Sequence, residues 1–560
     1  MPAAKRCQTR ALLWASLLAA LLGLASCGGD DDPVDPLAPF RNQVLHWQAC
    51  DPTALGDYAE QAYALGDRVA CADLRAPLDY ADPAKGEIKV ALLRVAAEDG
   101  APRQGAILMN PGGPGIDGLP MPLIIGQRWN LPRQSSPADQ LFQSIAQRYD
   151  LIGFSPRGVG SSTRLDCATG VEQRFIVNPA RDRSPTNTDN MLYNARQIAE
   201  SCRDNPMTPH IHSDAIARDM DLVRHLLGDE QLNFFGISAG SWLGNWYAGL
   251  FPGRVGRMVL WAVLDFTKIL NDQDLVQETA KQRILDQVLI PYATRFPTRF
   301  ELGTDPQAIR QMLDDLPLEL HAATVSALNQ NLARSSADSA VQTLRATQVV
   351  SHLLAGTPGI DEVALLALVE TSAELNALIR PLAVSLVREF FRQQAGADMP
   401  LDVIGQDATT WAIFCNDTGT DFSPERWVEL SNQNVALAPD FGGDRNLKPC
   451  LYWGGPSVHK PAQQVAGLAP GMVLVQAELD PLTPLAGARN SLGSLPNASL
   501  IEISDEYTHF LFPPYGVECV DRPIAEYFLT GQQPPRETRC QGLPLTADAE
   551  AIPISTPSIQ

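Results

Sequence analysis

The sequence is short of positive charge: its 560 residues include 43 lysines and arginines against 64 aspartates and glutamates, a formal net charge of −21. Because no basic patch is present that could neutralise phosphates, nucleic acid is excluded as a partner. The ten cysteines contain no Cys-x-x-Cys pair and the eight histidines form no metal-binding cluster, so neither a metal nor an organic cofactor is indicated. What is present is the composition of a globular protein, 45% hydrophobic and too long for one simple core.

No apolar run is long enough for a transmembrane helix, but the N-terminus carries a shorter one. Lys5, Arg6 and Arg10 come before a run of about 16 apolar and small residues, ALLWASLLAALLGLAS, which ends before Cys27. A membrane-spanning helix needs about 20 apolar residues. The pattern therefore predicts a secretory signal peptide instead of a membrane span.

The end of this run, LASC at Cys27, resembles the bacterial lipobox, where signal peptidase cuts before a cysteine that becomes lipid-modified. We therefore expect a lipoprotein signal peptide over residues 1–26 and a flexible Gly-, Asp- and Pro-rich tether over residues 27–39. The resemblance implies an exported lipoprotein of the cell envelope, facing the periplasm or the cell surface, that meets the membrane only through acyl chains on Cys27. Ordinary secretion is the alternative.

Apart from Cys7 in the signal peptide and Cys27, the sequence contains eight cysteines. An even number in an oxidising compartment predicts disulfides. Sequence alone does not fix their connectivity, and pairing of nearest neighbours, which closes loops of modest length, is the arrangement we expect. The four expected pairs are Cys50 with Cys71, Cys167 with Cys202, Cys415 with Cys450, and Cys519 with Cys540.

The order of local patterns predicts the fold class. Segments typical of strands and of helices alternate along residues 40–265, which predicts a mostly parallel sheet with helices on both faces. Residues 266–400 have helical periodicity with almost no strand signal, as an inserted helical cap would. Strand signals return over residues 401–540, and residues 541–560 resemble a loose tail. We therefore expect an α/β core in two parts, interrupted by the cap.

One strand signal, LNFFGIS, runs into the motif Gly236-x-Ser238-x-Gly240 and then into a helix. The motif alone is weak evidence, but between a strand and a helix it has the context of a nucleophile elbow, a sharp turn that lifts a serine above the sheet. The two glycines are needed because side chains there would collide with neighbouring backbone. Ser238 is therefore the candidate nucleophile. It requires a base to take its proton and an acid to orient that base.

The base and the acid are expected in the C-terminal part, because such folds use the chain order Ser, acid, His. His509 follows the strand signal SLIEIS and is the candidate base, with His459 as the one late rival. Asp480 ends the strand signal GMVLVQAELD and is the candidate acid; an aspartate in an ordinary turn or helix cap is the alternative. Asp505 and Glu506 are too close in sequence to His509 to approach its ring easily.

Acyl transfer also requires two backbone amides that bind the developing oxyanion. One is expected from Ala239, directly after the nucleophile. The second is expected from the loop NPGGPG at residues 110–115, which follows an earlier strand signal. Its glycines allow the backbone to approach a substrate closely, and Gly113 is the candidate donor.

Taken together, these segments resemble the secreted bacterial tripeptidyl aminopeptidases and their relatives, α/β-hydrolases akin to the prolyl aminopeptidases. The resemblance covers most of the chain after the signal peptide. It includes the blocks CADLRAPLDYADP, MNPGGPGIDG, YDLIGFSPRGVGSS, NFFGISAGSWLGNWYAGLFPGRVGRMVL, FCND, AELDPLTPLAGAR and CVDRPIAEYFLTGQQP. It implies an α/β-hydrolase fold with a C-terminal region like that of the tripeptidyl aminopeptidases. It places the family's triad on Ser238, Asp480 and His509, the residues that motif and chain order also indicate.

The sequence departs from the family pattern at several positions near the predicted site. Ala239 and Ser241 stand where the family usually has Tyr and Thr, Ser155 replaces the aspartate of its DPRG block, and Trp261-Ala262 replaces Asp-Gly. Because the oxyanion contact is made by backbone, we expect the chemistry to survive with a wider acyl pocket. The cap, which selects the substrate in such enzymes, matches least, so the preferred substrate stays open.

These features favour a serine exopeptidase that releases short N-terminal units from peptides through an acyl-enzyme. A carboxylate must then pair with the substrate's free amine, and Glu370 and Glu374 of the cap are candidates. An esterase or lipase with the same triad is one alternative. A non-catalytic envelope binding protein on a hydrolase fold is another, and it predicts a missing triad member, whereas none is missing.

Overall fold

The structure, a computed structural model, describes residues 35–98, 100, 102–130, 138–334, 337–420 and 422–546. The predicted signal peptide, Cys27, the tether as far as residue 34 and the tail beyond residue 546 lie outside the described residues.

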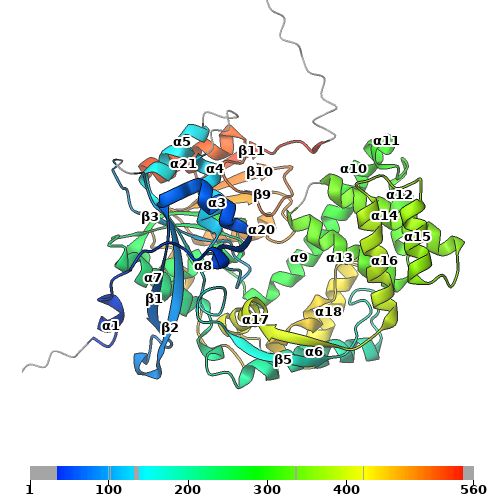
Figure 1. Ribbon diagram of the computed structural model, residues 1–560, viewed down its shortest axis with the longest axis horizontal. Coiled ribbons are helices and arrows are strands. Elements are labelled where there is room, and N and C mark those ends of the chain that lie inside the picture. The colour runs from blue at the N-terminus through cyan, green and yellow to red at the C-terminus, as the bar shows by residue number, and fades with distance from the viewer. Residues whose placement is uncertain are drawn as a thin grey trace, which may run out of the picture.

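A nine-stranded sheet forms the centre of one half of the molecule (Figure 1). Its strand order is β1-β2-β4-β3-β6-β7-β9-β10-β11. The pairs β1–β2 and β2–β4 are antiparallel, and the other neighbours are parallel. The strands are β1 (Val69–Pro77), β2 (Glu87–Val95), β3 (Ala106–Asn110), β4 (Asp150–Phe154), β6 (Leu232–Ile237), β7 (Val255–Trp261), β9 (Val473–Ala477), β10 (Ser499–Ser504) and β11 (Glu537–Gln541).

The central strands are buried on both faces, as parallel strands covered by helices must be. Every residue of β3, β4 and β9 is buried. Successive side chains enter different cores: Leu108 and Phe234 join the cluster beneath α7 and α8, whereas Met109 and Phe235 join the cluster beneath α4, α5 and α21 (Figure 1). The expected α/β class, a mostly parallel sheet with helices on both faces, is confirmed.

The helices of this half, with those that connect it to the rest, are α1 (Ala38–Arg41), α2 (Pro52–Leu55), α3 (Ala59–Leu65), α4 (Met121–Asn130), α5 (Ala138–Arg148), α6 (Pro185–Arg203), α7 (Ser213–Leu226), α8 (Ala239–Leu250), α17 (Gly405–Asp417), α18 (Pro424–Leu437), α19 (Gln463–Ala466), α20 (Leu485–Ser494) and α21 (Glu518–Thr530).

A second group of helices stands beside the sheet and has its own apolar core (Figure 1). The core is built mainly from residues 284–390 and also includes Ala438, Phe441 and Tyr507, so segments far apart in sequence contribute to it. We refer to this group as the helical layer. Its helices are α9 (Gln273–Ile284), α10 (Ile290–Arg295), α11 (Pro297–Phe300), α12 (Pro306–Asp314), α13 (Leu318–Arg334), α14 (Ala337–Gly356), α15 (Glu362–Thr371) and α16 (Arg380–Ala395).

Three strands carry little sequence signal. β5 (Asp166–Gln173) and β8 (Met399–Ile404) form a separate antiparallel pair, and β11 adds a parallel edge to the main sheet. These strands are polar or half-exposed: of the five residues of β11, only Cys540 is buried. Because few of their side chains are buried, burial contributes little to these three strands.

Four disulfides join the described cysteines as nearest neighbours: Cys50–Cys71, Cys167–Cys202, Cys415–Cys450 and Cys519–Cys540. The expected pairing is confirmed, and it fits an exported protein. None of the helices among the described residues has the length and apolarity needed to cross a membrane. The same residues contain no group of three or more His, Cys, Asp or Glu side chains suited to a metal ion.

A fully buried ion pair ties the loop after β4 to α7. Arg157 Nε and Nη2 donate to the two carboxylate oxygens of Asp219 at 2.8 and 2.7 Å, and both side chains are at most 1% exposed. Arg157 also donates to the carbonyls of Pro77 and Leu78, and Tyr80 donates its hydroxyl to Asp219. The pair therefore joins three segments of the core.

The departure at Ser155 has a local cause in the same loop. The Ser155 hydroxyl donates to Asp117 Oδ1 at 2.7 Å. An aspartate at position 155, as in the family's DPRG block, would place a second carboxylate against Asp117, and two like charges in contact repel each other. The serine is therefore matched to its neighbour.

The substitution Asp219→Ala should lower the free energy of unfolding by about 3–5 kcal/mol, because it leaves the Arg157 charge buried without a partner. Asp214→Ala on the same helix is the matched control: Asp214 pairs with the partly exposed Arg218. The control should cost about 1 kcal/mol or less. Denaturant unfolding measures both, and equal losses would contradict the role given to the buried pair.

Candidate active site

Ser238 sits at a strained turn between β6 and α8. Its backbone angles are φ 56° and ψ −123°, a region that residues other than glycine rarely adopt. The Ser238 amide donates to the Trp261 carbonyl of the neighbouring strand at 2.9 Å. The Ser241 amide and hydroxyl both donate to the Ser238 carbonyl, at 2.8 and 2.6 Å. The turn is thus held from both sides, and Ser238 itself is half-buried.

The two motif glycines are required by close backbone contacts. A Cβ on Gly236 would lie 2.5 Å from the Gly240 carbonyl oxygen, and a Cβ on Gly240 would lie 2.5 Å from the Asn110 carbonyl oxygen. Real Cβ atoms do not approach backbone that closely. The second contact also shows that the elbow lies directly against the end of β3.

The loop after β3 approaches the elbow through Gly112. This residue has φ +96°, and a Cβ on it would lie 2.4 Å from the Ile237 carbonyl oxygen and 2.8 Å from the Ala239 amide nitrogen. The Gly112 amide donates to Asn110 Oδ1 at 2.9 Å. Because that amide is engaged, Gly113 remains the candidate for the second oxyanion donor, next to the Ala239 amide.

Asp480 and His509 meet at the same edge of the sheet, after β9 and β10. His509 Nδ1 lies 2.9 and 2.8 Å from the two carboxylate oxygens of Asp480, and both residues are fully buried. Since a carboxylate only accepts hydrogen bonds, Nδ1 carries the proton. The structure therefore brings the candidate acid and base into contact.

The opposite ring nitrogen of His509 is available to act as a base. His509 Nε2 is buried and has no hydrogen-bond partner among the described residues. In the part of the chain that the structure describes, no hydrogen bond joins it to the hydroxyl of Ser238, although β6 and β10 end at the same edge of the sheet. Catalytic hydrogen bonds are often long in the absence of substrate and tighten in the complex.

Thr483 completes the surroundings of the acid, and sequence reasoning missed it. Its amide donates to Asp480 Oδ1 at 2.8 Å, its hydroxyl donates to Oδ2 at 2.9 Å, and the hydroxyl lies 3.4 Å from His509 Nδ1. The Leu482 amide also donates to Asp480 Oδ1 at 2.8 Å. An aspartate that accepts amides two and three residues on is a recognised turn pattern, so Asp480-Pro-Leu-Thr483 held a usable signal.

The residues weighed against His509 and Asp480 in the sequence have other environments. His459 is exposed, as is Asp505. Glu506 accepts hydrogen bonds from the amides of Tyr507 and Thr508, at 2.9 and 2.7 Å, and from the hydroxyl of Tyr515. Glu506 therefore shapes the loop that carries the histidine.

The helical layer contacts the residues that flank the acid and the base. Tyr507 is part of the core of the helical layer, and Leu479 packs against that core. These residues lie two positions before His509 and one position before Asp480. By contrast, Glu370 and Glu374, the carboxylates suggested for binding an N-terminal amine, are exposed, and Glu374 pairs with Arg345 at 3.4 Å.

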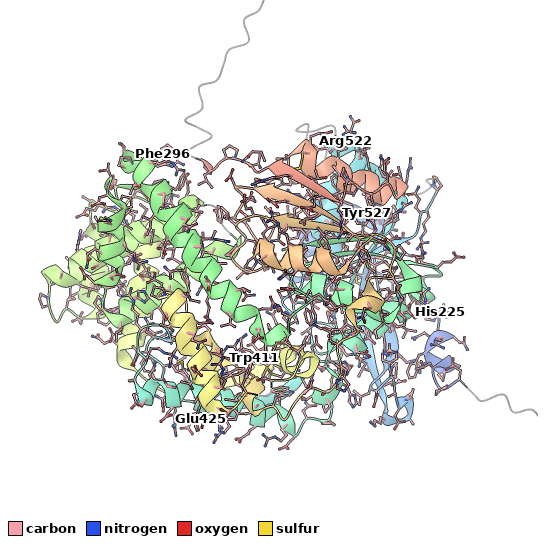
Figure 2. All side chains as sticks on the ribbon, turned by 180° about the vertical axis from the view of Figure 1, so that it is seen from behind. His225, Phe296, Trp411, Glu425, Arg522 and Tyr527 are labelled. Atoms are coloured by element: carbon pink, nitrogen blue, oxygen red, sulfur yellow. A yellow bond between two sulfur atoms is a disulfide. The ribbon has the colours of Figure 1, made fainter. Side chains whose placement is uncertain are left out.

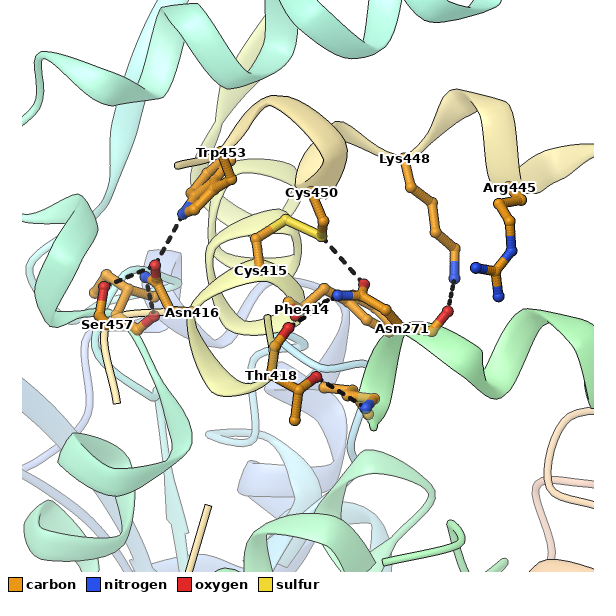
Figure 3. The surroundings of a disulfide bond; sticks show 12 residues. Asn271, Phe414, Cys415, Asn416, Thr418, Arg445, Lys448, Cys450, Trp453 and Ser457 are labelled. Atoms are coloured by element: carbon orange, nitrogen blue, oxygen red, sulfur yellow. Dashed lines mark hydrogen bonds between the residues drawn. A yellow bond between two sulfur atoms is a disulfide. The ribbon is translucent and has the colours of Figure 1, made fainter. Parts of the chain in front are cut away.

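The block FCND ends α17 and fixes it to the surrounding segments (Figure 3). Cys415 is bonded to Cys450. The Asn416 amide group donates to the carbonyls of Thr208 and Ile211 at 2.7 and 2.9 Å, and its oxygen accepts from Trp453 and Ser457. Asn271, at the start of the helical layer, donates to the Thr418 carbonyl at 3.0 Å.

Asp417, the last residue of this block, lies fully buried beneath the elbow helix. It accepts from the Ser213 amide and hydroxyl at 2.7 and 2.6 Å and from Trp242 Nε1, on α8, at 2.9 Å. Burial outweighs these hydrogen bonds and raises the pKa of the Asp417 carboxyl to about 7. A carboxyl that changes charge near neutral pH thus joins α7, α8 and α17.

Comparison with known proteins finds similar sequences over most of the chain. Residues 105–346 match the model of the alpha/beta hydrolase fold, and residues 438–540 match that of the TAP-like proteins. The tripeptidyl aminopeptidase of Streptomyces lividans is 26% identical over 507 residues, covering 84% of this chain and 83% of that protein. Serine protease Hip1 of Mycobacterium tuberculosis is 25% identical over 94% of this chain and 97% of its own. Carboxylesterase B of the same organism is 29% identical over 96% of this chain and 98% of its own length.

The sheet and these matches show that the chain has the α/β-hydrolase fold. Within that class it resembles the tripeptidyl aminopeptidases over most of its length, and its C-terminal region is TAP-like. The resemblance drawn from the sequence blocks is therefore confirmed.

Replacing Gly112 by Ala should destabilise the protein far more than replacing Gly454. The two glycines have nearly the same backbone angle, φ +96° and +97°, but a Cβ on Gly454 would meet nothing within 4 Å. In both variants an alanine must adopt a positive φ, which destabilises the protein by about 1–2 kcal/mol. Gly112→Ala should cost a further 1–3 kcal/mol, roughly, because of the overlap with the elbow. Denaturant unfolding compares the two, and equal losses would disprove the close approach.

The raised pKa of Asp417 predicts a pH dependence of stability. Because the unfolded carboxyl titrates near its ordinary pKa of 3.8 and the folded one at about 7, the protonated carboxyl stabilises the fold below about pH 4, and this contribution is lost as the pH rises to 7. Between about pH 4 and pH 7, the free energy of unfolding of the wild-type protein should fall by about 2–4 kcal/mol more than that of Asp417→Asn. Asp407→Asn, at an exposed site of the same helix, is the control and should follow wild type. Denaturant unfolding at a series of pH values measures this difference. Parallel curves of unfolding free energy against pH for wild type and Asp417→Asn would contradict the raised pKa.

Proposed function

We propose that the chain is a serine hydrolase that releases short units from the N-termini of peptides through an acyl-enzyme on Ser238. One observation carries the proposal: a buried His509 is held by Asp480 through Nδ1 while its Nε2 is left without a partner. The relatives named tripeptidyl aminopeptidase and serine protease support the choice of peptides as substrates.

In the first step, the Ser238 oxygen attacks the carbonyl carbon of the scissile bond while His509 Nε2 takes the hydroxyl proton. The positive imidazolium that forms is stabilised by Asp480, whose carboxylate is fixed by the amide and hydroxyl of Thr483. The negative charge on the substrate oxygen is bound by the amides of Ala239 and Gly113. Every group in this step comes from a rigid strand end or the loop that directly follows it.

The second half of the reaction uses the same groups. His509 gives its proton to the leaving amine, and the C–N bond breaks, leaving the N-terminal unit as an ester on Ser238. Water, deprotonated by His509, then attacks the ester and regenerates the serine. No metal or organic cofactor takes part in these steps.

The helical layer supports an exopeptidase over an endopeptidase. Its apolar core includes Tyr507 and packs against Leu479, so it contacts the loops that carry the base and the acid. An extended protein chain would have to pass between this layer and the sheet, whereas a free chain end can enter from one side. The carboxylate that binds the substrate's amine is expected on the inner face of this layer.

The protein is also proposed to act in the cell envelope, held by acyl chains on Cys27. Four disulfides fit an exported protein, and the sequence before residue 35 has the signal and lipobox patterns described above. Peptides reaching the outer face of the membrane would then be its substrates.

An esterase with the same catalytic residues is the second candidate, favoured by the relative named carboxylesterase B. Ester and amide hydrolysis differ mainly in whether the leaving group must be protonated, and the arrangement of Ser238, His509 and Asp480 serves both. Substrate preference therefore separates the two candidates.

The first test compares a tripeptidyl amide that has a free N-terminus with its N-acetylated form and with a short acyl ester. We expect kcat/KM to fall about 100-fold or more on acetylation, because a buried carboxylate would lose its charged partner. Comparable turnover of the acetylated amide, or turnover of the ester alone, would overturn the exopeptidase assignment.

The catalytic roles are tested with matched pairs of variants on the same amide. Asp480→Asn should lower kcat about 10⁴-fold and His509→Ala by a similar or larger factor. Asp505→Asn and His459→Ala, in the same region, should retain wild-type activity. Retention of activity in either triad variant would contradict the assignment.

A further inference from the structure

A cavity lies far from the catalytic residues, between α1, α7 and the end of α8. Its volume is about 270 Å³. Its lining brings together four arginines and a histidine from three separate segments. Because α8 begins beside Ser238 and ends at Leu250, the length of a 12-residue helix, roughly 18 Å, separates this cavity from the nucleophile.

The cavity combines an apolar floor with a cationic rim. Phe40 and Leu222 are buried in the main core and form part of the floor. Arg41, Arg218 and Arg254 form the rim, with side chains 46%, 38% and 46% exposed. A site of this kind suits a ligand with an anionic head and an adjoining apolar part.

Three carboxylates, Asp35, Asp214 and Asp221, lie against the four arginines of the cavity, so the arginines and their partners carry one net positive charge. Asp221 is the one acidic residue in the lining, and it is shared by Arg224 and Arg254. Arg218 Nε donates to the Asp214 carboxylate, and Arg41 Nη1 donates to the Asp35 carboxylate. A guanidinium has five N–H donors, and its planar fork matches the oxygens of a phosphate. The arginine of each rim pair is 38% to 46% exposed, and ion pairs of exposed arginines contribute about 1 kcal/mol or less, so a phosphate can compete for these guanidinium groups.

The cavity lies beside the point where the described chain begins. His225, one of the lining residues, is next to α1 at the margin of the molecule (Figure 2). Only seven residues lie between Cys27 and Asp35, and the eight residue-to-residue steps from one to the other reach about 28 Å at most when extended. Helices α15 and α16 of the helical layer are at the opposite end of the molecule (Figure 1).

We propose that this cavity binds the phosphate of an anionic phospholipid headgroup in the membrane to which the chain is tethered. Arg41, Arg218 and Arg254 hold the phosphate, and the apolar floor takes the glycerol backbone next to it. The inference rests on the proposed anchor at Cys27 and is independent of the proposed catalysis. For a chain with a net charge of −21, one cationic site beside the tether fixes which face meets the membrane. The helical layer then points away from the lipid.

The test is co-sedimentation of the chain from Gly28 onward, which contains every described residue and has no acyl chain. The vesicles contain phosphatidylcholine alone or phosphatidylcholine mixed with phosphatidylglycerol. We expect binding to the mixed vesicles and little binding to phosphatidylcholine. The triple variant Arg41→Ala, Arg218→Ala and Arg254→Ala should bind the mixed vesicles roughly tenfold more weakly.

The control variant makes the same change in charge elsewhere. Arg392, Arg426 and Arg522 are comparably exposed, at 49%, 46% and 42%, and each pairs with at least one nearby glutamate on its own helix. Their triple replacement by Ala should leave vesicle binding within about twofold of wild type.

Three results would overturn the proposal: no preference for mixed vesicles, an equal loss in the control variant, or full competition by millimolar inorganic phosphate, which would mark a site for free anion. Amide hydrolysis by the same preparations should equal wild type, because the cavity lies at the far end of α8. A wild-type protein that binds the mixed vesicles but does not hydrolyse the amide would contradict the proposed catalysis and not the lipid site.

Discussion

The close contact between two backbone turns is the constraint on which the site depends. Strands β3 and β6 are parallel neighbours, so the loop after β3 and the elbow after β6 emerge side by side. Gly112 approaches the Ala239 amide, and Gly240 approaches the Asn110 carbonyl, at distances that leave no room for a side chain. This contact brings the loop that carries Gly113 against the turn that carries Ser238 and Ala239. Because both turns are anchored in a buried sheet, the geometry exists before any substrate arrives.

The acid and the base depend on a different set of contacts, which couples them to the helical layer. Asp480 is held by Thr483, and the loop of His509 is shaped by Glu506. The neighbouring Tyr507 is anchored in the core of the helical layer. The helical layer thus packs against residues that flank the candidate acid and base.

The parts of the site that follow a local rule could be predicted from sequence. The glycines around Ser238, the chain order, and the buried strands before Asp480 and His509 each have a recognisable pattern. Interactions between distant segments could not be predicted in this way. Thr483 was missed although its turn pattern was visible, and Asp417 was missed because its partners on α7 and α8 are distant in sequence. The strands β5 and β11 were missed because they are mostly polar, and β8 was missed because only one of its residues, Val403, is buried.

The most direct measurement is a crystal structure of the protein after reaction with a tripeptidyl phosphonate that has a free N-terminus. The inhibitor should be bonded to the Ser238 oxygen, with its phosphonyl oxygen within hydrogen-bond distance of the Ala239 and Gly113 amides. His509 Nε2 should face the Ser238 oxygen, and the peptide amine should meet a carboxylate of the helical layer. A phosphonate attached to another residue, or an oxygen turned away from both amides, would contradict the proposed site.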